Sequence, residues 1–534
     1  MPDAKLSLTP SAALADELTL LDTERPGRTM ALVISIYSAL WIAVTVLLSP
    51  TVPYDAVEAW HWGQVLEAGS PKNPWLVGLT AALGQYGSLS WPAYWYTSHV
   101  VAVAIGAWGC WKLCERLIPD TRHAMLAVLM MSYSATISID MLPYNDNYLL
   151  MMLWPWMNYG FIRALYDNPR YWLQLGAVMA LAGMAKYTTV LYVPFMAAIV
   201  VVQGRLRATL AQPWLWAGIG VGVVLVAPNL FWLFQHDFAA FRWFADRVGG
   251  GRAWDVACVY LAVFYNALLI VAVLKLSRWR WCWPVRREVQ SFVVLAVVPV
   301  VLLGLYFAVR GGVRTEWMMP FAVPLGLAVV MCMTPSEHGR FRLPLYMGYA
   351  IAALMLCGFG ASKSWQIFYS TRPRDHVASL AVTLNEWWQD RYQQPLRYLG
   401  GSRLGDWVAL YAPDHPQTPT RWPSADVRAA TLEGHSPYPN TYTPGLSDQQ
   451  LARYGAMWVG DANSLCNSPG VLELDPLLSP ELREHIEYHT LIFQQNRVRS
   501  TSFSVCVGVL PPAQRGAASE PEASHMNTGL VTEE

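Results

Sequence analysis

Residues 30–49 read MALVISIYSALWIAVTVLLS, an apolar stretch without a charged side chain. Roughly twenty residues of α-helix are about 30 Å long, which is the thickness of the hydrocarbon core of a bilayer. Further apolar stretches follow at short intervals, and several contain Gly or Pro, which membrane helices tolerate. The sequence therefore predicts a mainly α, polytopic membrane bundle of about eleven spans, at about residues 30–49, 93–112, 123–139, 147–166, 171–186, 188–203, 214–235, 254–275, 291–309, 317–334 and 344–361.

The composition of the 534-residue chain supports a membrane protein and excludes other classes. Charged residues make up 14% of the chain, whereas a soluble protein has about a quarter. The 37 basic and 37 acidic side chains balance, which excludes the basic field of a nucleic-acid-binding protein. A large water-soluble helical core is the remaining alternative, and so many apolar stretches with so few charges argue against it.

The distribution of Lys and Arg predicts the orientation of the bundle. Alternate loops hold 14 of these residues on one side and seven on the other, which places the N-terminus in the cytoplasm. Residues 1–29 form a polar cytoplasmic segment without the apolar region of a cleaved signal, so we expect the first span to act as a signal anchor. Eleven crossings end the transmembrane domain, residues 30–361, on the outside.

The composition changes after residue 361, where Pro, Asp, Gln and Arg are spread evenly. Residues 362–512 are predicted to form a small extracytoplasmic α/β domain, and residues 513–534 a disordered tail. Cys466 and Cys506 are the two cysteines of this domain, and an oxidising exterior would allow a disulfide between them. The strand-like segments are Leu396–Leu399, Trp407–Tyr411, Met457–Val459 and Phe503–Leu510.

Two carboxylates follow the first span, in the loop PYDAVE at residues 53–58. Asp55 and Glu58 are three residues apart, so on a helix they share one face. Neighbouring carboxylates push each other's pKa values apart, which leaves one ionised and able to act as a base. A solvated loop with two ordinary acids beside an aromatic interface belt explains the same residues, and both interpretations stay open here.

Other ionisable residues lie in the remaining loops expected outside, where such groups beside apolar spans often mark function. Lys72 precedes the short apolar stretch 76–83, which fits an interfacial helix, so its side chain either snorkels to the headgroups or holds a phosphate. Lys186 lies in the turn of an apolar hairpin with no acid near it in sequence. Acids early in the chain and cations later suit an anionic lipid-linked substrate beside a carboxylate base, and the remaining candidates are Asp140, Asp146, Arg247 and Arg314.

At these residues the chain resembles the polytopic glycosyltransferases of the GT-C fold, in the bacterial protein-mannosyltransferase-like branch (families 39 and 83) that includes the lipid A aminoarabinose transferases. The resemblance covers about residues 30–330, and the tail resembles their small extracytoplasmic domain. The acidic motif of the family matches Tyr54, Asp55 and Glu58, although Ala56 replaces its second acid. Lys72 matches a Lys-x-Pro-Pro-Leu segment with its second Pro lost. The other matches are Asn145 and Asn147 with Leu149 and Leu150, Lys186 and Tyr187 with Met184, and His236 and Asp237 with Trp232, Leu233 and Phe238.

The resemblance implies an inverting transferase that moves a hexose or pentose from a polyprenyl-phosphate donor to an envelope acceptor, which is a lipid, a glycan or a protein. Asp55 would be the catalytic base and Glu58 its helper. The donor phosphate would be held by Lys72, Lys186, Arg247 and Arg314. Contacts with the sugar or the acceptor would come from Asp140, Asn145, Asp146, Asn147, Tyr187, His236 and Asp237.

The same resemblance implies a bacterial inner (plasma) membrane protein, with membrane lipids, the lipid-linked donor and the acceptor as partners. Relatives differ in metal use, and the sequence has no His/Cys cluster with zinc spacing, so no metal or other cofactor is required. Two alternatives stay open. A transporter or flippase of lipid-linked sugars would show broken helices in paired halves, and Ala56 would also fit a GT-C scaffold without activity.

Overall fold

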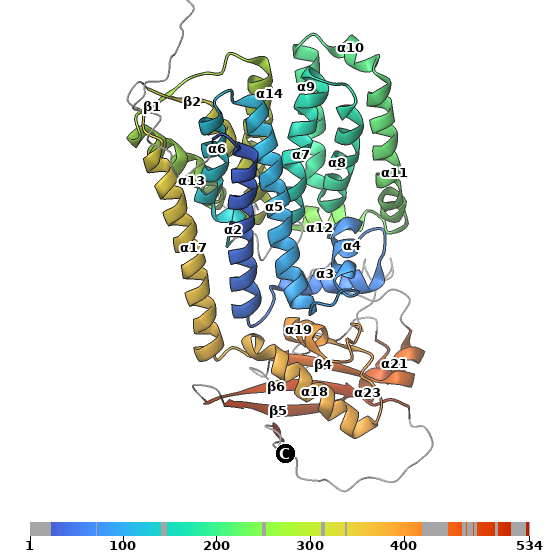
Figure 1. Ribbon diagram of the computed structural model, residues 1–534. Helices are drawn as coiled ribbons and strands as arrows, with labels where there is room; N and C mark the ends of the chain where they lie inside the picture. The colour runs from blue at the N-terminus through green and yellow to red at the C-terminus, as the bar shows by residue number, and fades with distance from the viewer. Residues whose placement is uncertain are drawn as a thin grey trace, which may run out of the picture.

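The computed structural model contains a helical bundle and, at one end of it, a smaller domain built on a β-sheet (Figure 1). It describes residues 23–70, 72–139, 147–247, 253–310, 315–336, 339–418, 447–461, 466, 472, 474, 478–496, 500–513 and 530–532. The mainly α fold class predicted from the sequence is confirmed.

A helix lies in each of the stretches predicted to span the membrane. These helices are α2 (Pro26–Leu48), α5 (Trp91–Leu117), α6 (Thr121–Leu129), α7 (Asn147–Tyr166), α8 (Tyr171–Ala185), α9 (Tyr192–Val202), α11 (Pro213–Gln235), α13 (Ala253–Leu276), α14 (Arg287–Arg310), α16 (Ala322–Met331) and α17 (Arg342–Tyr369). Among the described residues, four helices are long and apolar enough to cross a membrane, namely α2, α11, α14 and α17. The number of eleven spans therefore stays a prediction.

Most helices differ somewhat from their predicted bounds, and for two of them local hydrogen bonds accompany the difference. The predicted span 123–139 is interrupted, because α6 ends at Leu129 and short 3-10 turns follow, η2 (Met130–Tyr133) and η3 (Ala135–Ile137). In these turns the Ser132 hydroxyl donates to the carbonyl of Leu129 at 2.8 Å, and such local bonds compete with helix continuation. Helix α17 continues to Tyr369, beyond residue 361, and within this extension the Lys363 ammonium donates to the Gln366 amide oxygen at 3.1 Å.

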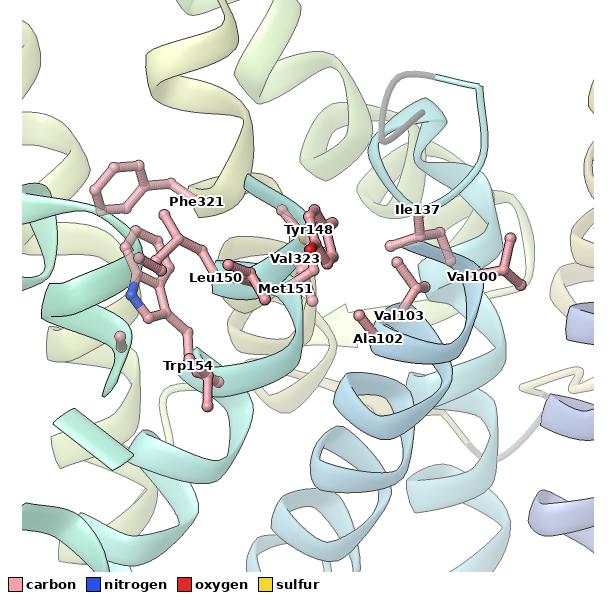
Figure 2. Packing of buried hydrophobic residues seen from close by; sticks show 14 of the residues in the cluster. Val100, Ala102, Val103, Ile137, Tyr148, Leu150, Met151, Trp154, Phe321 and Val323 are labelled. Carbon is pink, nitrogen blue, oxygen red and sulfur yellow. The ribbon is translucent and has the colours of Figure 1, made fainter. Parts of the chain in front are cut away.

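The interior of the bundle is aromatic and apolar. Helix α5 packs on α2 and α7, α7 on α8, and α8 on α11. Figure 2 shows part of this interior, where Trp154 of α7 lies beside Phe321 with ring centroids 4.9 Å apart. On the outside of α2, the side chains of Leu32, Ile36 and Leu40 are exposed one turn apart. Such an exposed apolar stripe fits a lipid environment.

The two ends of the bundle differ. One end carries α3 (Tyr54–Val65), α4 (Trp75–Leu83) and α12 (Ala239–Arg247), and the sheet domain adjoins it (Figure 1). The opposite end carries α10 (Leu206–Leu210) and a two-stranded sheet of β1 (Trp279–Trp281) and β2 (Met333–Pro335). The acidic loop and the C-terminal domain are therefore at one end, as predicted, while the side that faces the cytoplasm stays a prediction.

The C-terminal domain combines a sheet with helices. In the described residues the sheet has the order β3-β4-β6-β5-β7, in which β3 and β4 are parallel and the other pairs antiparallel. Its strands are β3 (Leu399–Gly401), β4 (Ala456–Asp461), β5 (Glu487–Asn496), β6 (Ser500–Leu510) and β7 (Leu530–Thr532). Its helices are α18 (Val377–Tyr392), α19 (Arg403–Tyr411), α21 (Asp448–Tyr454) and α23 (Pro480–Glu484). Cys466 and Cys506 form a disulfide with Cα atoms 5.2 Å apart.

The strands predicted for this domain are confirmed only in part. The segment Trp407–Tyr411 belongs to helix α19, because Ser402 caps the start of the helix and the apolar residues repeat at helical spacing. Strand β5 was not predicted, since its polar residues hide its alternation. Within the predicted tail 513–534, Val531 of β7 pairs with Ile492 of β5, and the disorder of the tail stays a prediction. Of the predicted strand Leu396–Leu399, only Leu399 lies in β3, whereas Met457–Val459 and Phe503–Leu510 lie in strands as predicted.

Candidate active site

Helix α3 places the acidic motif across one end of the bundle (Figure 1). The chain leaves α2 at Ser49, and Pro53 in extended conformation precedes the first turn, where Asp55 favours the positive end of the helix dipole. Helix α3 packs against α4 and α19, and residues 56–63 are buried. A Cβ on Gly63 would lie 2.8 Å from the backbone nitrogen of Ala82, so α3 and α4 are in backbone contact.

Lys72 forms ion pairs with both acids of this helix. Its Nζ lies 3.1 Å from Oδ1 of Asp55 and 2.6 Å from Oε2 of Glu58. The Glu58 side chain is 2% exposed, whereas those of Lys72 and Asp55 are 21% and 28% exposed. Of the two carboxylates, Asp55 is therefore the one that a substrate can reach.

The turn before α4 holds Lys72 in place. The Ser70 hydroxyl donates to the carbonyl of Asn73 at 2.9 Å and accepts hydrogen bonds from the backbone N–H groups of Lys72 and Asn73. A β-bridge between Gly69 and Pro74 closes the same turn. The backbone of Lys72 is thus fixed, and its side chain alone can change partners.

Burial dominates the electrostatics of α3. It raises the pKa of Glu58 to about 7, against the opposing effect of Lys72 and with a smaller contribution from Asp55. Burial also lowers the pKa of His61 to about 3, so this imidazole is neutral near pH 7. Burial thus favours the neutral forms of Glu58 and His61, whereas Asp55 and Lys72 are the partly exposed side chains of the site.

An aromatic side chain covers Lys72. Its Nζ lies 5.8 Å from the ring centroid of Trp243 on α12, within the range of a cation–π interaction. Helix α12 is held by ring contacts of Phe241 with Tyr187 and of Phe244 with Trp317, at 5.2 and 5.3 Å. Trp243 thus borders the site next to Lys72.

A second group of predicted residues lies at the ends of α7, α8 and α11. The Lys186 ammonium donates to Oδ1 of Asn147 at 3.0 Å. The Tyr187 hydroxyl donates to Oδ1 of Asn229 at 3.0 Å, and Nδ2 of Asn229 donates to the carbonyl of Ala68 at 2.8 Å. Tyr187 is therefore connected through Asn229 with the loop that leads to Lys72.

The segment around His236 supports the same loop. The His236 ring stacks on Trp232 with centroids 4.2 Å apart, and the Trp232 indole donates to Glu67 at 2.8 Å. Asp237 follows at the end of α11 with a positive φ of 49°. His236 thus acts on the loop through Trp232.

The structure brings together Asp55, Glu58 and Lys72, which were predicted as base, helper and phosphate ligand. Arg247 is the last residue of helix α12. The remaining predicted site residues, Asp140, Asn145, Asp146 and Arg314, lie outside the described residues. Within the described residues there is no cluster of three or more potential metal-ligating side chains.

One buried residue beside the site was not predicted. The Tyr54 hydroxyl donates to Oδ2 of Asp406 at 2.6 Å, and Asp406 belongs to α19 of the C-terminal domain. The residues that follow it, Trp407–Tyr411, were interpreted as a strand, and Asp406 itself was not assigned to the site. The available signal was an acid within an amphipathic helical pattern that follows a capping Ser402.

Comparisons with known proteins concern the fold of the chain. The family Dolichyl-phosphate-mannose-protein mannosyltransferase matches residues 68–232. No curated protein sequence matches the chain. The crystal structure of ArnT from Cupriavidus metallidurans bound to undecaprenyl phosphate aligns with a TM-score of 0.56 and 12% identity, over 90% of this chain and 99% of that one.

The apo crystal structure of the same ArnT aligns over the same shares of both chains, with a TM-score of 0.54 and 12% identity. The resemblance noted in the sequence is thereby confirmed at the level of the fold. Residues 68–232 match the mannosyltransferase family, and the chain has the GT-C fold of the integral-membrane glycosyltransferases.

Proposed function

We propose that this protein is an integral-membrane, inverting glycosyltransferase that takes a sugar from a polyprenyl-phosphate donor to an acceptor of the cell envelope. The single observation that carries the proposal is the triad of Asp55, Glu58 and Lys72, in which one ammonium touches two carboxylates at the end of a membrane bundle. ArnT with the same fold binds undecaprenyl phosphate, which supports a lipid-phosphate ligand for this chain.

When the donor binds, its phosphate replaces Asp55 as a partner of the Lys72 ammonium. A phosphate that approaches Lys72 offers a charged acceptor, and an ammonium–phosphate contact is a strong charge-assisted hydrogen bond. Glu58 retains the ammonium from its buried side, while the more exposed Asp55 is released for the acceptor. Lys186, which Asn147 orients, and Arg247 and Arg314 are the further cations that we assign to the phosphate.

The transfer step is a displacement at the anomeric carbon. Asp55 accepts the proton of an acceptor hydroxyl as that oxygen forms a bond to the carbon, on the face opposite the phosphate. The bond from the carbon to the phosphate oxygen breaks, and its electron pair stays on the lipid phosphate, where Lys72 stabilises the charge. The configuration is inverted, and the leaving phosphate needs no acid.

The remaining assignments concern contacts and location. Asp140, Asn145, Asp146, Asn147, Tyr187, His236 and Asp237 are proposed to bind or frame the sugar and acceptor. The acceptor is a lipid, a glycan or a protein of the envelope, and the sugar is a hexose or a pentose. The bundle is placed in the bacterial inner (plasma) membrane, with the N-terminus in the cytoplasm and the C-terminal domain outside.

Transfer by the purified protein tests the proposal. The chain in lipid nanodiscs is given labelled undecaprenyl-phosphate hexoses and pentoses with envelope extract, and products are identified by mass spectrometry. The Asp55→Asn variant should transfer about 10²- to 10⁴-fold more slowly, because general base catalysis is lost, and should still bind undecaprenyl phosphate. Asp120→Asn is the matched control, since Asp120 caps α6 and takes no part in the site.

Two outcomes would reject the proposal. Movement of the donor between leaflets of vesicles without any transfer would indicate a transporter. Equal envelope products in cells with and without the protein would indicate a scaffold.

A further inference from the structure

The C-terminal domain holds the turn that joins α2 to α3. The Trp407 indole of α19 donates to the carbonyl of Val52 at 2.9 Å, and the backbone N–H of Val52 donates to the Tyr411 hydroxyl at 3.0 Å. Both backbone polar groups of Val52 are therefore bound by one helix that lies about 350 residues later in the sequence. The start of α3 is defined by α19.

The same helix binds the first residue of α3. The Tyr54 hydroxyl donates to Oδ2 of Asp406 at 2.6 Å, and the Asp406 side chain is buried. The Tyr54 ring contacts the Trp407 ring at 5.4 Å between centroids, and the Arg403 guanidinium lies 5.0 Å from the Tyr54 ring centroid. Tyr54 is thus held by α19 at its hydroxyl and at its ring, and the next residue is Asp55.

The far end of α3 also touches the C-terminal domain. The Gln64 amide donates to the carbonyl of His415 at 3.4 Å, and the Trp60 and His415 rings lie 6.2 Å apart. Contacts at both ends of a helix fix its rotation about its own axis. Since Asp55 and Glu58 project from one face, this rotation decides where the two carboxylates lie relative to Lys72.

A helix as short as α3 depends on such contacts. Isolated helices below about 12–15 residues are marginal in water, so its position comes from its neighbours and not from its own stability. A charge-assisted hydrogen bond to a buried carboxylate is short and directional. A displacement of a catalytic group by about 1 Å can reduce a rate about 10²-fold.

We propose that Asp406 is a positioning residue of the transfer reaction, which acts through Tyr54 to hold Asp55 in its working place, so that the C-terminal domain is part of the active site. The inference rests on the proposed function. It assigns to the domain a role in catalysis beyond that of a covering module.

Three single variants and one double variant test the hydrogen bond between Tyr54 and Asp406 from both sides. Asp406→Ala and Tyr54→Phe each remove the hydrogen bond, and the second keeps the ring contacts. Both should lower kcat about 10- to 100-fold, with the KM for the donor changed less than about threefold, because Lys72 lies on a separate loop. Asp406→Asn keeps an acceptor oxygen for Tyr54 and should recover most of kcat. The double variant Tyr54→Phe/Asp406→Ala should be no slower than the slower single variant, since both remove one interaction.

Asp414→Ala is the matched control within the same domain. Asp414 accepts hydrogen bonds from the Gln389 amide and from the backbone N–H of Leu396, and so it serves the domain itself. A purely structural role of Asp406 predicts the same result for both aspartates, namely a lower melting temperature with unchanged kcat per folded molecule. Such equality, or wild-type kcat in Tyr54→Phe, would overturn this inference while transfer by the wild type still stands. Absence of transfer in the wild type would instead overturn the proposed function, and this inference with it.

Discussion

The ammonium of Lys72 lies 2.6 Å from Oε2 of Glu58, a carboxylate that is almost completely buried. A buried carboxylate without a cation or a proton is strongly unfavourable, so Lys72 offsets part of the free-energy cost of burying this one. The same ammonium reaches Asp55 at 3.1 Å on the exposed side. Lys72 is thus placed to give up its exposed partner to a phosphate and to keep its buried one.

Replacement of Lys72 tests its role as a phosphate ligand. We expect Lys72→Met to weaken the binding of undecaprenyl phosphate about 10- to 100-fold, because hydrogen bonds to charged groups contribute about 1.5–3 kcal/mol. Lys72→Arg should retain part of the affinity, and titration of the lipid into nanodisc-embedded protein measures both. Lys112→Met is the control, since Lys112 is not part of the site. Its Nζ lies 2.7 Å from Oε2 of Glu115. Equal affinities of Lys72→Met and the wild type would refute the assignment.

The pKa of Glu58 predicts how stability depends on pH. Burial raises it from 4.5 to about 7, so between these pH values the folded chain binds more protons at this group than the unfolded chain. The contribution of Glu58 to the free energy of unfolding therefore falls as the pH rises from about 4.5 to about 7. Glu58→Gln cannot titrate, and the melting temperature of the wild type relative to this variant should fall between about pH 5 and pH 7.

The control for this measurement is Glu115→Gln, which changes an exposed acid on α5. Its melting curve should follow that of the wild type across the pH range. Parallel curves for Glu58→Gln and the wild type would show that Glu58 keeps the same charge in the folded and unfolded chains, against our prediction.

The bundle was predictable because its signal is local. A membrane helix needs a continuous apolar stretch of fixed length, and such stretches can be read without knowing which helices touch. The common face of Asp55 and Glu58 was predictable for the same reason, since helical spacing decides it. The fold class and the acidic end of the site therefore followed from the sequence.

The contacts of the site were not predictable, because they depend on docking between distant segments. Lys72 was expected at the lipid headgroups or on a phosphate, and the structure places it between the two acids. Asp406 went unnoticed since the short apolar pattern of Trp407–Tyr411 suits a strand or a helix equally well. Its proposed role depends on the hydrogen bond from Tyr54, a residue that is distant in the sequence and adjacent in the fold.

Cysteine labelling tests the predicted orientation. Cys282 is exposed next to β1, and the disulfide of Cys466 and Cys506 lies in the sheet domain at the opposite end (Figure 1). A membrane-impermeant maleimide added to intact spheroplasts should leave Cys282 unlabelled. It should label Cys466 and Cys506 only after their disulfide has been reduced. Permeabilised cells are the control, in which Cys282 should react. Labelling of Cys282 in intact spheroplasts would indicate the opposite orientation of the protein in the membrane.

The contact between α8 and α11 gives a prediction about packing. A Cβ on Gly176 of α8 would overlap the carbonyl group of Gly218 on α11, so the two backbones touch without side chains between them. Gly176→Val should force the helices apart and destabilise the bundle by about 1–3 kcal/mol, which is typical of overpacking. The shift also reaches the site, because Asn229 and Trp232 of α11 hold the loop that leads to Lys72. Thermal unfolding in detergent and binding of undecaprenyl phosphate measure the two effects.

The same substitution at Gly220 separates packing from helix propensity. Gly220 also lies in α11, and a Cβ there would meet nothing within 4 Å. Gly220→Val makes the same exchange of Gly for a β-branched residue within a helix, so its intrinsic effect on helix stability is similar. We expect its melting temperature and its lipid affinity to stay close to those of the wild type. Equal losses in the two variants would mean that the close approach of α8 and α11 contributes nothing, and that the loop before Lys72 is positioned by other contacts.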